Sequence, residues 1–100
     1  MTHYEKLVRD RNPEILDAKG VSYEKRIADD TEYRTELIKK LVEEAAEFSE
    51  AGSIEELADV LEVIAALRVL PEYADVEVVR VKKVAERGSF SERIILKGEK

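Results

Sequence analysis

The sequence predicts a mainly α-helical fold, and two long segments with helical periodicity carry this prediction. In the first segment, apolar residues recur every three or four positions from Leu37 to Phe48, which is typical of one face of a helix that ends near Ala51. The second segment, residues 54–70, is apolar over most of its circumference, so we expect it to be buried on several sides. Apolar residues make up 44% of the chain and charged residues 40%, a mix typical of a helix-rich globular protein.

The N-terminal part of the chain predicts one short helix followed by a more extended segment. Asn12 is a good helix cap, Pro13 fits a first helical turn and Gly20 is a good stop, so we expect a helix over residues 13–19. Residues 21–28 are rich in β-branched side chains and partly alternating, which favours a short strand.

The two long helices have recognisable starts and a clear end. Asp29 is placed to cap the first helix, with Glu32 reaching back to complete a capping box. Ser53 and Glu56 show the same pattern at the start of the second helix. Pro71 prevents that helix from continuing easily, because proline lacks the amide hydrogen that a helix interior requires.

The C-terminal part is harder to assign. Residues 72–87 contain enough valine to form a strand, but the glycine that follows at position 88 is typical of a helix end, so we favour a helix. Residues 90–97 are more strand-like and could pair with residues 21–28. The predicted fold class is therefore mainly all-α, with room for one short two-stranded β element.

Composition and charge exclude several classes of protein. A chain of 100 residues fits a single domain spanning residues 1–100. The formal charge of −6 argues against a nucleic-acid partner, which requires a basic surface. The chain has no cysteine, and His3 is its only histidine, which leaves little basis for thiolate, serine–histidine or histidine–zinc chemistry. No stretch has the apolar length of a signal peptide or a membrane span, so we expect no membrane partner and a cytoplasmic protein.

Four acidic residues are the most informative feature of the chain. Glu44 and Glu47 lie three residues apart, as do Glu56 and Asp59, so each pair projects from one face of its helix. If the chain turns at Gly52, the two helices become antiparallel and all four carboxylates can converge. Unpaired carboxylates in one place repel each other, and a divalent cation would remove that cost. Ligand sets made only of oxygen suit Mg²⁺ or Mn²⁺.

The positions of the acids on their helices strengthen this interpretation. Glu56 shares its side of the helix with Val60 and Val63, where a carboxylate is costly unless something binds it. Glu44 lies at the edge of the apolar face of its own helix. An ordinary alternative remains, because glutamates are common on solvated helix surfaces and Glu56 also serves as the capping-box acid for Ser53.

With these residues in view, the chain resembles the MazG-like, all-α nucleoside triphosphate pyrophosphohydrolases, a superfamily that includes the phosphoribosyl-ATP pyrophosphohydrolases. The central E-x-x-E and E-x-x-D pattern of that family reads EEAAEF and EELADVLEVI here. This subgroup tends to begin with K-L-V-R-D-K-I-P, which resembles KLVRDRNP at residues 6–13. It tends to end its last helix with R-G-G-F, which resembles RGSF at residues 87–90. The departures, Asn12 and Ser89, leave the acids untouched.

The resemblance implies a helical bundle that forms a homodimer or a dimer of dimers, which agrees with the helix that is apolar on all sides. It implies a Mg²⁺-dependent enzyme, with Mn²⁺ as a possible substitute, that cleaves a nucleoside triphosphate to the monophosphate and pyrophosphate. The alternatives are phosphoribosyl-ATP hydrolysis and a non-catalytic helical dimer that serves as a binding module. The implied metal-binding and catalytic residues are Glu44, Glu47, Glu56 and Asp59, and the implied phosphate contacts are Lys6, Arg9, Lys83 and Arg87.

Overall fold

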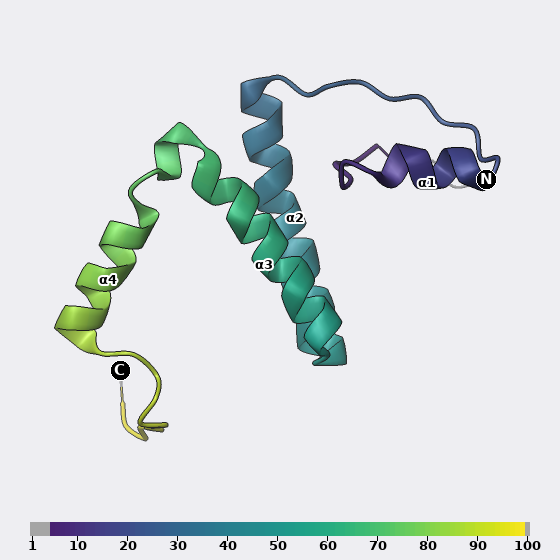
Figure 1. Cartoon of the computed structure of the whole chain (residues 1–100). Helices are drawn as coiled ribbons and strands as arrows, with labels where there is room; N and C mark the ends of the chain where they lie inside the picture. Colours follow the sequence, from purple (N-terminus) through teal and green to yellow (C-terminus); the bar gives the residue numbers. More distant parts are fainter. Residues whose placement is uncertain (1–4, 100) are drawn as a thin grey trace.

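The computed structural model describes residues 5–99, and in this range the chain forms four α-helices and one short 3-10 helix (Figure 1). The predicted all-α class is confirmed. In chain order the elements are α1 (Asn12–Ala18), α2 (Asp30–Ala51), α3 (Ile54–Val69), η1 (Pro71–Tyr73) and α4 (Val76–Arg87).

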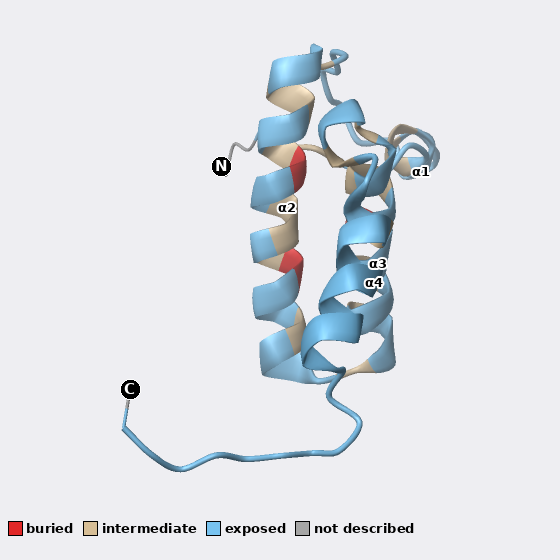
Figure 2. Cartoon of the chain, turned by 90° about the vertical axis from the view of Figure 1, so that its left-hand side faces the viewer, coloured by how far each residue is buried: buried red, intermediate tan, exposed pale blue. Residues whose placement is uncertain are grey.

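Helices α2 and α3 form an antiparallel hairpin, which is the main helix–helix contact of the structure (Figures 1 and 2). The turn between them passes through Gly52, whose φ of 62° lies in the left-handed region that glycine adopts without strain. Immediately after the turn, Oγ of Ser53 accepts a hydrogen bond of 3.2 Å from the backbone amide of Glu56. This cap satisfies one of the free amides at the start of α3, as the sequence predicts.

The other predicted helix starts are partly right. Oδ1 of Asp29 caps α2 by accepting a hydrogen bond of 2.8 Å from the amide of Glu32. The carboxylate of Glu32 does not reach back to the cap, because it binds the guanidinium of Arg26 instead, and such charged hydrogen bonds are stronger. Helix α1 begins one residue earlier than expected: Asn12 lies inside it, and no side chain caps it.

The predicted β element is wrong. No residue between 5 and 99 belongs to a strand, and residues 21–28 and 90–97 lie at separate ends of the molecule (Figure 1). Residues 21–28 connect α1 to α2, whereas residues 90–97 follow α4 and are exposed throughout. A two-stranded ribbon without further strands or a covering helix is only marginally stable, so β-branched sequence alone does not produce one.

The apolar core of the single chain is small. Only two apolar side chains among residues 5–99 are buried, Leu37 and Val63, which are 3% and 8% exposed. The radius of gyration is 17.9 Å, whereas a compact domain of this length has about 13 Å. Most of the surface of every helix is accessible (Figure 2). No helix in the described range is long and apolar enough to cross a membrane.

The small core makes its few members important. We expect Leu37→Ala to lower the free energy of unfolding by about 2–4 kcal/mol, because it leaves a cavity in the hairpin. Leu96 is 89% exposed, so the matched control Leu96→Ala should change stability by less than about 0.5 kcal/mol. Urea unfolding followed by circular dichroism at one protein concentration measures both. Equal losses in the two variants would show that Leu37 is not a core residue.

Candidate metal centre

The hairpin brings acids from both of its helices together. Glu44 of α2 and Glu56 and Asp59 of α3 each offer a carboxylate oxygen, and these three oxygens lie within 4.8 Å of one another. A second group of the same kind, Glu43, Glu44 and Glu47, lies along α2. Glu44 belongs to both groups, so it joins all four acids singled out in the sequence. Glu47 meets Glu56 and Asp59 only through this shared residue.

The burial of Glu44 sets this cluster apart from an ordinary acidic surface. Glu44 is 8% exposed, and it is the only charged residue in the described range that is buried. The Oε2 atoms of Glu44 and Glu56 are both buried and have no hydrogen-bond partner. A buried carboxylate oxygen without a partner is costly, because it has lost the water that solvated it. Asp59 is half-buried, whereas Glu47 is exposed.

Lys40 provides partial compensation for this charge. Its Nζ lies 3.6 Å from Oε1 of Glu44 and 3.6 Å from Oε1 of Glu43, one helical turn away on α2. The contact with Glu44 involves Oε1, so it leaves Oε2 without a partner. The sequence analysis missed Lys40, although its position one helical turn before Glu43 and Glu44 was the signal that could have indicated it.

The surroundings of Glu44 disfavour its charged form. Burial raises the pKa of the Glu44 carboxyl group, and the charge of Glu47 raises it further. The ammonium group of Lys40 opposes this shift, while the charge of Asp59 adds to it. In the absence of a further cation, ionised Glu44 therefore lowers the stability of the folded state.

Two basic residues from the N-terminal segment lie against the same acids. Nη2 of Arg9 is 2.7 Å from Oδ1 of Asp59, and Nζ of Lys6 is 3.4 Å from Oε1 of Glu43. The structure therefore places Lys6 and Arg9, two of the four predicted phosphate contacts, beside the acidic cluster.

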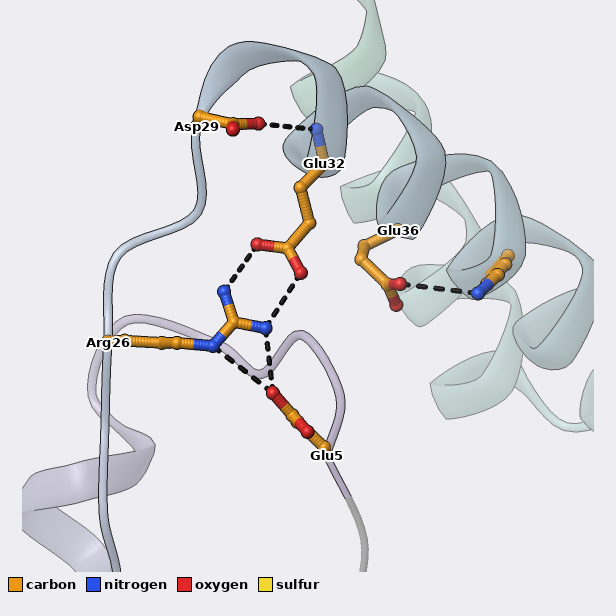
Figure 3. Close-up of polar contacts among 6 residues, drawn as sticks. Glu5, Arg26, Asp29, Glu32 and Glu36 are labelled. Carbon is orange, nitrogen blue, oxygen red and sulfur yellow. Dashed lines mark hydrogen bonds and ion pairs between the residues drawn. The ribbon is translucent and has the colours of Figure 1, made fainter.

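Arg26 holds this N-terminal segment at the start of α2 (Figure 3). Its guanidinium donates hydrogen bonds of 2.7 and 3.1 Å to Oε1 of Glu5. The same guanidinium donates bonds of 2.5 and 2.7 Å to the two carboxylate oxygens of Glu32. Because the bond from Arg26 favours the ionised form, the pKa of Glu32 is held below its ordinary value.

Lys83 and Arg87, the other two predicted phosphate contacts, lie elsewhere. Both are exposed on α4, which is on the opposite side of the hairpin from α1 (Figure 1). No hydrogen bond or ion pair in the described part of the chain connects them to the acids. An apolar pocket of about 280 Å³ lies between the hairpin and the start of α4, and none of the acids lines it.

The raised pKa of Glu44 has a consequence for stability. A group that binds its proton more tightly in the folded state destabilises the fold at pH values above its folded pKa, and this penalty disappears as the pH falls toward its ordinary value. We therefore expect Glu44→Gln to raise the melting temperature in EDTA at pH 7–8, with a gain that shrinks as the pH approaches 5. Differential scanning fluorimetry measures this.

The matched control is Glu50→Gln, an exposed glutamate on the same helix that is outside both groups of acids. It should leave the melting temperature nearly unchanged across this pH range. If metal-free Glu44→Gln has a lower melting temperature than the wild-type chain, the charge of Glu44 does not destabilise the fold.

Comparisons with protein-family models, with curated proteins and with solved structures found no match to this chain.

Proposed function

We propose that this chain is a Mg²⁺-dependent nucleotide pyrophosphohydrolase with a MazG-like helical fold. It would cleave a nucleoside triphosphate to the monophosphate and pyrophosphate, which implies a cytoplasmic location. The observation that carries the proposal is the convergence of Glu44, Glu56 and Asp59, with two buried carboxylate oxygens that lack partners. The motifs KLVRDRNP and RGSF on either side of these acids support it further.

The donor set fits a magnesium ion. All the ligands are carboxylate oxygens, which Mg²⁺ and Mn²⁺ accept readily. Each oxygen ligand of Mg²⁺ lies about 2.1 Å from the ion. The three oxygens of Glu44, Glu56 and Asp59 lie within 4.8 Å of one another, so small side-chain rotations would close them around an ion. Glu47 would complete the ligand set from the exposed edge.

The residues of the chain have distinct roles in the proposed reaction. Bound Mg²⁺ would neutralise charge on the triphosphate and lower the pKa of a coordinated water. The exposed carboxylate of Glu47, or that of Glu43 beside it, would accept the proton of the water that attacks the α-phosphorus. Lys6 and Arg9 would contact the phosphate oxygens, and the planar guanidinium of Arg9 can donate two parallel hydrogen bonds to them.

We also propose that the working form is a homodimer or a dimer of dimers. The small core and the extended shape of one chain leave many apolar side chains without cover. On α3, Leu57 and Leu61 are 42% and 58% exposed, and on α4, Val78 and Val81 are 70% and 53% exposed. A second hairpin packed on α3 would bury the first pair. Assigning Lys83 and Arg87 to the phosphates requires that α4 of a second copy approach the acids.

The activity is tested by release of pyrophosphate from a panel of ordinary and modified nucleoside triphosphates, with and without Mg²⁺. We expect Glu44→Gln and Asp59→Asn to reduce turnover by about 10²–10⁴-fold, because each removes a ligand of the ion that activates the water. Circular dichroism should show that both variants keep their helices. The control Glu50→Gln should remain fully active.

Near-normal turnover by both ligand variants would contradict the assignment of these acids. If the wild-type chain releases no pyrophosphate from any substrate but forms a stable dimer, the non-catalytic binding module becomes the better description.

The assembly is tested by light scattering at micromolar concentration. We expect the wild-type chain to have at least the mass of a dimer, and Leu61→Glu to shift the population toward monomer, because it places a charge in the apolar contact. Leu96→Glu, on the exposed C-terminal segment, should leave the mass unchanged. A monomeric wild-type chain would refute the proposed assembly.

A further inference from the structure

Arg9 occupies one side of the proposed metal centre. Its Nη2 donates to Oδ1 of Asp59 at 2.7 Å, and Asp59 is one of the three acids whose oxygens converge between the two helices. Both side chains are substantially exposed, 63% for Arg9 and 40% for Asp59, so this ion pair is accessible to solvent and can be exchanged at low cost.

A guanidinium and a divalent cation compete at this position. Both are attracted by the same carboxylate, and like charges within a few ångströms of each other repel. Exposed ion pairs contribute little to stability, so a metal ion that also has Glu44 and Glu56 as ligands should win this competition. Arg9 would then lose the partner that holds it in the metal-free protein.

We propose that Arg9 is an exchangeable internal counter-ion: it neutralises Asp59 in the metal-free protein and transfers to a substrate phosphate when a divalent cation takes over Asp59. This inference depends on the proposed metal-dependent function. It specifies the order of binding: the metal ion binds first and releases Arg9, which then binds the phosphate.

The anchoring of the N-terminal segment allows this transfer without loss of position. Glu5 is held to Arg26, and Arg26 is held to Glu32 of α2, by the hydrogen bonds drawn in Figure 3. This anchor is independent of Asp59, so the segment remains beside the hairpin when Arg9 releases it. Arg9 lies only four residues after Glu5, and its long side chain can swing from the carboxylate to a phosphate nearby.

The transfer predicts effects of opposite sign on two ligands. Removing the Arg9 charge removes a competitor for the metal ion but also removes a donor to phosphate. Metal binding should therefore tighten, whereas phosphate binding to the metal-loaded protein should weaken. An arginine that only supports the local structure would weaken both when it is removed, so the two measurements together separate these roles.

The experiment is isothermal titration calorimetry of the full chain with Mg²⁺ and Mn²⁺, and then of the protein at saturating Mg²⁺ with inorganic pyrophosphate. We expect Arg9→Gln to bind the metal about two- to fivefold more tightly, as loss of one exposed competing ion pair allows. It should bind pyrophosphate at least tenfold more weakly, because a charged hydrogen bond to phosphate is lost.

The matched control is Arg11→Gln, which removes the same charge from the same segment. Arg11 pairs with Glu14, 3.2 Å away, and Glu14 is outside both groups of acids. Both affinities should therefore stay at their wild-type values. Arg9→Gln that binds the metal as wild type does, or more weakly, would overturn the counter-ion role while leaving the proposed function standing. A wild-type chain that binds neither metal would overturn both.

Discussion

The packing of α2 against α3 forms both the core and the candidate metal centre of this chain, because the same contact that buries Leu37 and Val63 also buries Glu44. A carboxylate in this place disfavours the folded state as long as it is ionised, and the ammonium group of Lys40 lies near only one of its two oxygens. The chain keeps a small core and inserts a charge into it. That combination is difficult to explain by stability alone, since an apolar residue at position 44 would pack more favourably.

The parts of the fold that local sequence determines were predictable. Helical periodicity, the caps at Asp29 and Ser53 and the glycine at position 52 define the hairpin, because each acts within a few residues of itself. The β element failed because strand pairing depends on distant segments meeting. Residues 21–28 instead connect α1 to α2, and Arg26 in this connection binds Glu5 of the N-terminal segment. A pattern of β-branched residues does not predict such a contact.

The candidate site shows the same division. Spacing along each helix identified Glu44, Glu47, Glu56 and Asp59, but it could not show that Glu44 would be the buried residue shared by two groups. That depends on the rotation of α2 relative to α3. The approach of Arg9 to Asp59 is likewise a contact between residues 50 positions apart, which no local pattern encodes. Lys83 and Arg87 lie far from the acids in their own chain, so sequence order alone could not place them.

In the proposed function, the charges around the centre would be balanced by one divalent cation for each chain. Among the described residues, five carboxylates belong to the two groups of acids, and three cationic side chains, those of Lys6, Arg9 and Lys40, pair with them. This leaves two negative charges without compensation, which is the charge of one Mg²⁺. If that ion releases Arg9 to a phosphate, the acids regain one negative charge and the substrate loses one. If the proposed function holds, one ion would balance the acids of the chain alone, and any second ion would have to be attracted by the charge of the triphosphate.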